Sequence, residues 1–505
     1  MANELLFSRL GGRTAAALRE GGVTAELRIE DDATALAAGR VIKGRVSKVL
    51  PGIQSAFLDV GQDRDAFLHV ADLLLPGESA EEFESDDDEL EGQGGSFRRA
   101  RRSAPPGRPI ESRLKVGREV LVQIVREGFS GKGPRVTCFI TLPGRYLVYA
   151  PLAPFRAVSR RIADPAERER LRAIVSSLPG EGGFIVRTAG AGASPRAFAA
   201  DAEKLAVAWR GLTHRAAAAV APAVVHSDLD LFLRTLRDAS AATLDRIVVD
   251  DDAMLAAGTE FLRELDPELL ARLSRHTGRE SLFDETGVTD EVERALRPRV
   301  WLKSGGTLVI QQTEALVSID VNTGKYLGAR HPEETVLKTN LEAAAEIARQ
   351  LRLRDLAGII VVDFIDMDRP EHRASVLEAL EGALRRDRAR TKIVGLSDLG
   401  LLQLTRKRTR AGLEATLTRP CPSCSGSGRV KTAETLALEA LVEVRRIAGA
   451  FSSGPLTVTS HPDVARALRL AIQVAGPVLD RSIAERLVVR EDPAAPSDRF
   501  DVSAL

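Results

Sequence analysis

The chain has 505 residues, which is more than one hydrophobic core usually supports, so several domains are expected. Its apolar fraction of 44% and charged fraction of 28% are those of an ordinary globular protein, and its three cysteines are too few for a disulfide framework. Lysine plus arginine (71) equals aspartate plus glutamate (71), so net charge by itself does not indicate a nucleic-acid partner.

The sequence also bears on the compartment. The amino-terminal segment carries Glu4 and lacks a sustained apolar stretch, so we expect no secretory signal. No apolar run approaches the ~18 residues that would suggest a membrane span. Together with the low cysteine content, these features favour a reducing compartment and a cytoplasmic protein.

The amino-terminal part is predicted to be rich in strands. Residues 1–35 alternate apolar and polar side chains around paired glycines, which is typical of short strands and turns. Residues 38–72 and 119–140 have strand patterns that fit one small barrel. Between them, residues 76–112 contain an acidic run, clustered arginines and prolines, which cannot form a core and predict a disordered insertion.

The rest of the chain is predicted to mix helices and strands. Residues 144–190 look α/β, and a helical region continues to about residue 297. From Trp301 onward strands and helices alternate as in a βαβ layer. A Pro/Cys/Gly-rich linker over 420–428 precedes a small terminal unit. Nine lysines and arginines lie between residues 385 and 410, and clustered charge of this kind can guide a polyanion.

Two aspartates end neighbouring predicted strands. The strand over 314–322 carries Asp320 and Asn322 at its polar end, and a second, apolar strand that we expect to be fully buried ends in Asp363. The segment between them, 333–354, has the apolar spacing of an amphipathic helix. A strand–helix–strand unit returns the second strand parallel to the first, so both aspartates should emerge at one sheet edge.

This arrangement predicts a metal site. Two carboxylates and an amide oxygen form an oxygen-only site that suits Mg²⁺. Such a metal can activate a water and neutralise charge on a phosphodiester. Either aspartate alone would more often cap a helix or simply end a strand, so the chemical interpretation depends on Asp320, Asn322 and Asp363 together.

Cys421 and Cys424 have the spacing of zinc ligands, but a closed structural site needs four. Cys138 lies in a distant apolar strand and is expected to be a buried thiol. A redox motif is the alternative, yet such a motif should open a helix, and Ser-Gly-Ser-Gly after Cys424 argues against one. The sequence therefore predicts half of a structural zinc site, completed by the same pair from a second subunit.

A long, nearly gapless block resembles the catalytic region of the ribonuclease E/G family. Its segments are Ser318-Ile-Asp-Val-Asn-Thr-Gly-Lys325, Thr339-Asn-Leu-Glu-Ala-Ala, Glu346-Ile-Ala-Arg-Gln-Leu-Arg-Leu-Arg354 and Val362-Asp-Phe-Ile-Asp-Met367. The resemblance implies that Asp320 and Asp363 bind the catalytic Mg²⁺, and that Asn322 orients Asp320 or the waters of the metal. It implies hydrolysis of RNA to 5′-phosphate and 3′-hydroxyl ends, and a zinc shared between protomers by Cys421 and Cys424.

The barrel segment resembles an S1 RNA-binding domain of the OB-fold type. Phe57 and Phe67, on consecutive strands, are candidates for stacking RNA bases, although either could belong to the barrel core. Lys132 matches a family position that contacts RNA. Basic residues are expected beside the two rings: Lys43, Arg45 and Lys48.

The segment 183–190 resembles the family's pocket for a 5′-monophosphate. Arg187 can fork a phosphate with two donors and the Thr188 hydroxyl adds a third. The same match implies that further residues line or support the pocket: Gly144, Val148, Arg160 and Arg390. RNA with a 5′-monophosphate is therefore expected to be cut faster than triphosphorylated RNA.

The resemblance implies a multidomain α/β protein closest to the ribonuclease G branch. The expected parts are a ribonuclease-H-like subdomain from 1–35 with 230–295, an S1 domain over 36–140 with the insertion 76–112, a 5′-sensor region over 141–229, a DNase-I-like catalytic subdomain over 296–417, a zinc link over 418–431, and a small C-terminal α/β domain over 432–505. The expected role is ribosomal RNA maturation and messenger RNA turnover by a homodimer or homotetramer. An RNA-binding regulator without chemistry and a DNA-directed nuclease are the alternatives.

Overall fold

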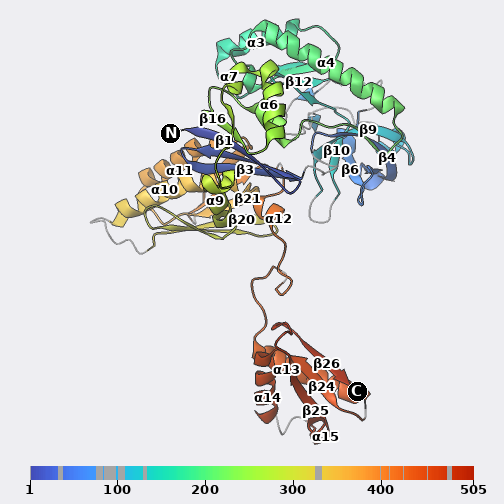
Figure 1. Ribbon diagram of the computed structural model, residues 1–505, viewed down its shortest axis with the longest axis vertical. Helices are drawn as coiled ribbons and strands as arrows, with labels where there is room; N and C mark the ends of the chain where they lie inside the picture. Colours follow the sequence, from blue (N-terminus) through green and yellow to red (C-terminus); the bar gives the residue numbers. More distant parts are fainter. Residues whose placement is uncertain are drawn as a thin grey trace. The chain divides into compact units, whose positions relative to one another are not determined.

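The computed structural model forms two compact units, Met1–Thr416 and Leu417–Leu505 (Figure 1). It describes residues 2–31, 38–74, 83–84, 98–99, 109–128, 133–324, 332–397, 400–408, 410–424, 426–451, 453–474 and 480–504. Lys132 and most of the predicted insertion at 76–112 lie outside the described residues. The predicted mixed α/β architecture is confirmed.

The first sheet joins the amino terminus to a segment far along the chain. Its strands, from edge to edge, are β17 (Leu273–Arg275), β16 (Arg246–Val249), β1 (Asn3–Leu10), β2 (Arg13–Glu20) and β3 (Val23–Asp31). β1 to β3 form an antiparallel meander, whereas β16 runs parallel to β1. Phe7 on β1 meets Phe232 edge to face, with ring centroids 4.7 Å apart, in the shared core.

Helices precede, separate and follow β16 and β17 in the sequence. They are α5 (Leu231–Asp238), α6 (Asp252–Leu265), α7 (Pro267–Leu270), α8 (Leu282–Glu285) and α9 (Val288–Ala295). The prediction of a purely helical region up to residue 297 is wrong, because β16 and β17, and β15 before them, interrupt it. Strands of three or four residues are too short for hydrophobic periodicity to reveal.

Five strands close into a small barrel. In order around it they are β4 (Val41–Leu50), β5 (Ser55–Asp59), β6 (Ala66–His69), β10 (Arg135–Thr137) and β9 (Glu119–Arg126), and β9 pairs back onto β4. The short helices are η1 (Pro51–Ile53), η2 (Val70–Asp72) and α2 (Ile110–Arg113). The predicted barrel is confirmed, and its architecture is consistent with an OB-like fold.

The predicted insertion ends earlier than expected. Ile110 is completely buried among the barrel residues and begins α2, so this part of the predicted insertion is a short helix anchored in the core by Ile110. Within the insertion, β7 (Phe83–Glu84) pairs antiparallel with β8 (Arg98–Arg99). The proline-rich composition around residue 109 concealed this return to the core.

A four-stranded sheet follows the barrel. Its order is β11 (Leu142–Pro143), β12 (Leu147–Ala150), β14 (Gly183–Val186) and β13 (Arg156–Val158). The accompanying helices are α3 (Pro165–Ser177), η3 (Thr188–Gly190) and α4 (Pro195–Ala218). After α4, β15 (Ala223–His226) joins the edge of β4, which ties this region to the barrel.

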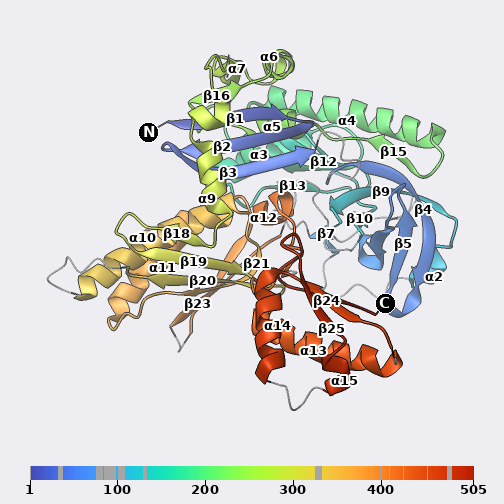
Figure 2. The ribbon, with the colours of Figure 1, turned by 60° about the horizontal axis from the view of Figure 1, so that its bottom comes forward.

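The third large sheet contains the two aspartates. Its order is β18 (Arg299–Trp301), β19 (Thr307–Gln312), β20 (Leu316–Asn322), β21 (Gly358–Asp363), β23 (Leu401–Arg406) and β22 (Thr391–Leu396). The helices α10 (Pro332–Leu353) and α11 (Pro370–Leu384) pack on one face of it, and α12 (Leu413–Leu417) follows β23 (Figure 2). The predicted helix over 333–354 is therefore confirmed.

Among the described residues of the first unit, helices cover one face of this sheet. Along β21, Ile360 and Val362 are buried against α10 and α11, whereas Ile359 is 54% exposed. The prediction that this strand is fully buried is wrong. A continuous apolar run indicates two buried faces in a doubly covered parallel sheet, but the described helices of this unit pack only on the other face.

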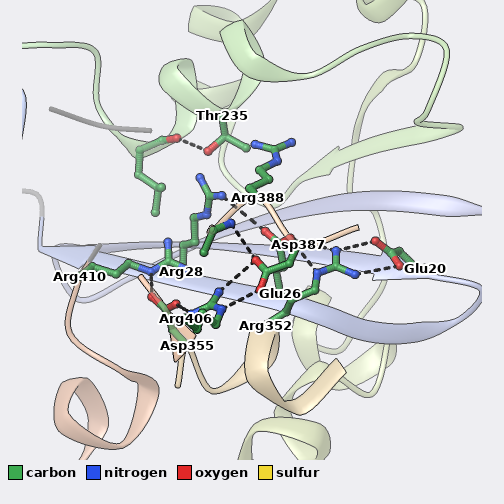
Figure 3. A network of polar contacts seen from close by, with 12 residues as sticks. Glu20, Glu26, Arg28, Thr235, Arg352, Asp355, Asp387, Arg388, Arg406 and Arg410 are labelled. Carbon is green, nitrogen blue, oxygen red and sulfur yellow. Dashed lines mark hydrogen bonds and ion pairs between the residues drawn. The ribbon is translucent and has the colours of Figure 1, made fainter. Parts of the chain in front are cut away.

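A buried network of charges joins the third sheet to the first (Figure 3). Arg352, near the end of α10, donates to Glu20 at 2.6 Å and to Glu26 at 2.9 Å, both from the amino-terminal sheet. Burial acts to raise the pKa of Glu26, but the guanidinium groups of Arg28, Arg388 and Arg352 outweigh it and lower the pKa to about 2. The two sheets are therefore held together by ionised groups.

The same network continues around the end of β23. Arg406 donates to Asp355 at 2.5 Å and to Asp387 at 2.7 Å, and Arg410 donates to Asp355 at 2.5 Å. Asp355 has a positive φ of 49° and lies two residues after the end of α10. Its two arginine partners fix the tight turn by which the chain enters β21.

The second unit is a small α/β layer. Its elements are α13 (Ala433–Ala450), β24 (Leu456–Ser460), α14 (Pro462–Val474), α15 (Arg481–Ala484), β25 (Leu487–Glu491) and β26 (Phe500–Ala504), with sheet order β25-β24-β26. Leu441 and Val444 of α13 pack with Leu456 and Val458 of β24. In neither unit does a described helix combine the length and hydropathy that a membrane span requires.

Candidate active site

Asp320 and Asp363 are direct neighbours on parallel strands. Asp320 of β20 is paired with Asp363 of β21, and adjacent strands lie roughly 4.8 Å apart. Both aspartates are exposed, whereas Ile319, Val321 and Val362 face the helical layer. The two carboxylates therefore lie side by side on the open face, where both strands end.

Asn322 belongs to the same cluster. Two residues beyond Asp320, it projects from the same face of β20. Its Nδ2 donates to Oδ2 of Asp320 at 2.8 Å. This hydrogen bond orients the Asp320 carboxylate.

The backbone after β20 depends on a glycine. Gly324 has a φ of 64°, and a Cβ on it would lie 2.1 Å from the carbonyl oxygen of Gly305. Both the left-handed conformation and the close approach exclude other residues. Gly324 therefore allows the chain after Asn322 to pass close to the turn between β18 and β19.

Asn340 holds the segment that follows Asp363. It lies completely buried on α10, donates from Nδ2 to the Ile365 carbonyl at 2.8 Å, and accepts from the Ile365 N–H at 3.2 Å. Sequence reasoning did not single out this residue. The available signal was an asparagine on the apolar side of an amphipathic helix, because a buried polar side chain needs a specific partner.

The donor set around Asp320 fits a hard divalent cation. Two carboxylates and a neighbouring side-chain amide are oxygen ligands of the kind that Mg²⁺ uses while it retains several waters. Among the described residues, no three or more His, Cys, Asp and Glu side chains gather as a metal-binding group. The site is thus compatible with Mg²⁺ but offers it only two carboxylates.

Phe57 and Phe67 form a cross-strand pair on the barrel. Their ring centroids lie 5.9 Å apart in an edge-to-face arrangement, and both rings are half-buried, outside the barrel's fully buried core. Lys48 is the register neighbour of Phe57, and Arg135 is that of Phe67. The structure thus places a basic residue on each side of the aromatic pair.

Two of the basic residues predicted to lie beside these rings bind other groups of the protein. Lys43 and Arg45 contact the Glu119 carboxylate at 3.0 and 3.3 Å. Both also donate to backbone carbonyls of the segment 219–221. They therefore fasten this segment to the barrel. Arg135, which was not among the predicted basic residues, donates to the buried Asp72 carboxylate at 2.7 Å.

The Arg187 side chain is buried and makes hydrogen bonds within the protein. Its Nη1 donates to the Gly144 carbonyl at 2.6 Å and its Nη2 to Asp238 at 2.8 Å. Burial acts to raise the pKa of Asp238, but Arg187 and Arg237 outweigh it and hold the pKa well below its ordinary value. The Nε of Arg187 is buried without a hydrogen-bond partner among the described residues.

The remaining predicted pocket residues have distinct environments. Thr188 is exposed at the start of η3, and its hydroxyl lies 3.4 Å from that of Ser159. The side chain of Val148 is buried in the core. A Cβ on Gly144 would lie 2.5 Å from the carboxylate of Asp201, which explains the glycine.

Asp201 is a second residue that sequence reasoning missed. Its carboxylate accepts backbone N–H groups of Arg145, Tyr146 and Leu147 at 3.3, 2.8 and 2.9 Å. It therefore shapes the loop whose Gly144 carbonyl binds Arg187. An aspartate within the alanine-rich helix α4 carried no recognisable motif.

Arg160 and Arg390 come from segments that touch. Both are exposed, and the adjacent Arg161 donates from Nη2 to the Arg388 carbonyl at 2.6 Å. This contact brings the end of β13 against the segment before β22. The structure thus brings together two segments that the predicted pocket draws on.

Known proteins match this chain over its whole length. The sequence profile of the Ribonuclease E/G family matches residues 141–409. Ribonuclease G of Escherichia coli strain K12 is 40% identical over 508 aligned residues, which cover 99% of this chain and 99% of that protein. The chain belongs to the ribonuclease E/G family.

Other relatives place it within this family. Ribonuclease G of Haemophilus influenzae is 40% identical over 507 residues and covers 100% of both chains. Ribonuclease E of a Nostoc species is 39% identical over 396 residues, which are 77% of this chain and 54% of that protein. These matches agree with the predicted closeness to the ribonuclease G branch.

The cysteine pair of this ribonuclease E/G family member lies in a turn. Cys421 is exposed and Cys424 half-buried, and no helix begins at them. Hydrogen bonds from the backbone of Cys424 and Ser423 lower the pKa of the Cys421 thiol. Cys138 is buried in the barrel core, as predicted. The pair offers two thiolates, half of a closed zinc site.

Proposed function

We propose that this chain is an endoribonuclease that hydrolyses internal phosphodiester bonds of single-stranded RNA with Mg²⁺. The observation that carries the proposal is the direct pairing of Asp320 with Asp363 on the open face of the sheet, oriented by Asn322. The relatives named ribonuclease G and ribonuclease E support a nuclease acting on RNA.

Asp320 and Asp363 would hold the metal. Mg²⁺ held there would supply an activated water and neutralise charge on the phosphodiester, as hydrolysis to 5′-phosphate and 3′-hydroxyl ends requires. Asn322 keeps one oxygen of Asp320 fixed. Asn340 fixes the chain beyond Asp363 through Ile365. The protein thus contributes two neighbouring carboxylates, and a hydrogen bond within the protein orients that of Asp320.

The barrel would hold the RNA strand as an S1 domain does. Phe57 and Phe67 offer ring faces for bases, and stacking of this kind tolerates any sequence. Lys48 would neutralise a backbone phosphate beside the rings, whereas Arg135 is held by the buried Asp72 carboxylate at 2.7 Å. Lys132 is proposed as a further RNA contact from the sequence match alone.

A 5′-monophosphate would bind beside Arg187 and Thr188. The buried Nε of Arg187, without a partner among the described residues, supports an anionic ligand there, because buried donors are almost always satisfied. Gly144 positions Arg187 through its carbonyl. Arg160 and Arg390 would add charge at the rim.

The finer organisation is also proposed. Residues 1–35 with 230–295 would form a ribonuclease-H-like subdomain and residues 296–417 a DNase-I-like one. Cys421 and Cys424 would share a structural Zn²⁺ with a second subunit, giving a homodimer or homotetramer. The enzyme would act in the cytoplasm on ribosomal RNA precursors and messenger RNA.

Cleavage of a 5′-monophosphorylated, A/U-rich single-stranded RNA tests the activity. We expect internal cuts with Mg²⁺, none with a chelator, and at least a 10³-fold loss in Asp320→Asn and Asp363→Asn. Asp368→Asn is the matched control, because this exposed aspartate lies outside the strand and the cluster.

The alternatives give different results. RNA binding without any cleavage by the wild-type protein would favour an RNA-binding regulator. Equal cleavage of a matched DNA strand would indicate a nuclease not specific for RNA. Cleavage that survives both strand-end substitutions would place the active site elsewhere and overturn the proposal.

A further inference from the structure

Trp301 is a large aromatic side chain on the open face of the catalytic sheet. It ends the edge strand β18, and 69% of it is exposed. Its neighbours Val300 and Leu302 pack into the core beneath the sheet, so the indole points to the other side. Single exposed apolar residues are common and need no explanation by themselves. Trp301 differs from such residues because of its position relative to Asp320 and Asp363.

Strand register places Trp301 in the same row as Asn322. Trp301 is paired with Thr307 on β19, and Thr307 is paired with Asn322 on β20. Residues paired across a sheet project from the same face. Two strand spacings, roughly 10 Å, therefore separate the backbones of Trp301 and Asn322.

Arg299 lies in the adjacent row. It is paired with Val309, which is paired with Asp320, which in turn is paired with Asp363. Arg299 is exposed and has no ion-pair partner within the part of the chain that the structure describes. An exposed indole and an unpaired guanidinium thus lie on one edge of the surface that presents the two carboxylates.

We propose that Trp301 stacks a base of the RNA strand beside the bond that is cut, while Arg299 contacts a neighbouring backbone phosphate. The proposal rests on the proposed function, because the aspartate pair marks where the strand is cut. An aromatic face that binds bases next to a cation that binds phosphate is the usual composition of a single-strand subsite. This subsite is separate from Phe57 and Phe67, which lie on the barrel.

The protein provides its own optical probe for this contact. Its two tryptophans are Trp301 and Trp209, and Trp209 lies partly buried against the core of the sensor region. In a Trp209→Phe, Asp363→Asn protein, the fluorescence comes from Trp301 alone and RNA is not consumed. We expect an unmodified A-rich single-stranded RNA to quench this emission along the same saturation curve as the anisotropy of a labelled copy of that RNA.

Kinetics on the active enzyme give a second measurement. Trp301→Ala should raise KM for the RNA roughly five- to tenfold and leave kcat within about twofold, as expected for the loss of one exposed stacking contact. Trp301→Phe should restore most of the affinity, and Trp209→Phe should change neither constant. One abasic nucleotide next to the cleaved bond should weaken binding as much as Trp301→Ala does, with no further loss when both are combined.

Three results would overturn the proposal. One is RNA binding, seen by anisotropy, without any change in Trp301 emission. Another is additive loss from the abasic nucleotide and Trp301→Ala. The third is emission that changes with protein concentration alone, which would assign Trp301 to a contact between copies of the chain. The fluorescence titration needs no cleavage, so its outcome is independent of whether the Asp320 and Asp363 variants abolish activity.

Discussion

Arg187 donates to Asp238 across 2.8 Å, and Asp238 also accepts from Arg237 at 3.1 Å. The proposed phosphate-binding arginine is thus held by a buried carboxylate before any ligand arrives. A buried, oriented guanidinium loses little conformational freedom on binding an anion. The same arrangement means that Arg187 contributes both to folding and to the pocket.

Two substitutions can distinguish recognition of the 5′-monophosphate from a contribution to the stability of the fold. Thr188→Val, at an exposed position, should reduce the preference for 5′-monophosphorylated over triphosphorylated RNA several-fold without changing thermal stability. Arg187→Gln should abolish the preference and also lower the free energy of unfolding by about 3 kcal/mol, because Asp238 loses one of its two cations. Rates on matched RNAs and thermal melting measure both. Equal preference in wild type and Arg187→Gln would exclude the sensor role.

Asn340 should act on the active site through the backbone. Asn340→Ala removes both hydrogen bonds to Ile365 and leaves buried groups unsatisfied, at a cost of about 2–3 kcal/mol in unfolding free energy. Because the bonded segment directly follows Asp363, we expect kcat to fall at least tenfold while KM changes little. Lys338→Ala, exposed on the same helix, is the control. An Asn340→Ala enzyme that is destabilised but has unchanged kcat would contradict the positioning role.

The buried charge network makes the free energy of unfolding depend on pH. The pKa of Glu26 falls from its ordinary value of 4.5 to about 2 in the folded protein. A lowered carboxyl pKa stabilises the fold fully above pH 4.5, and the contribution disappears as the pH falls toward 2. The contribution is about 3 kcal/mol. Denaturant unfolding at several pH values should show a shallower acid loss for Glu26→Gln than for wild type, and parallel curves would argue against this assignment.

The cysteine pair predicts a metal-dependent assembly. Removal of zinc with a strong chelator, or Cys421→Ser, should convert the oligomer to monomers and release about half a zinc ion per chain. Cys138→Ala, in the barrel core, should leave metal content and mass unchanged while lowering stability. Analytical ultracentrifugation with metal analysis distinguishes these cases. A full zinc ion bound by each monomer would exclude sharing between subunits.

The pairing of Asp320 with Asp363 could be predicted from the sequence, but the contacts that support this sheet could not. Asp320 and Asp363 end two strands joined by one helix, so local patterning and the handedness of such units suffice to bring them together. The partners of Arg352, by contrast, are Glu20 and Glu26, which precede it by 332 and 326 positions. No local pattern connects residues so far apart.

The exposure of Ile359 escaped prediction for a related reason. An apolar run reports that a strand is hydrophobic, but the number of helical layers that cover its sheet is a property of the whole fold. Here the uncovered face is the one that carries the carboxylates and Trp301. The face of β21 that was wrongly predicted to be buried is therefore the face that leaves the two carboxylates accessible.

The amino-terminal sheet has a consequence for synthesis on the ribosome. β1 to β3 are complete by residue 31, yet β16, which covers the edge of β1, spans Arg246–Val249, and β17, which covers β16, spans Leu273–Arg275. At typical elongation rates this delay lasts about 10 to 50 seconds. Throughout that time the nascent meander presents an unpaired strand edge, which is a template for aggregation. The barrel, whose strands all lie within Val41–Thr137, can close while the first sheet is still waiting for its last two strands.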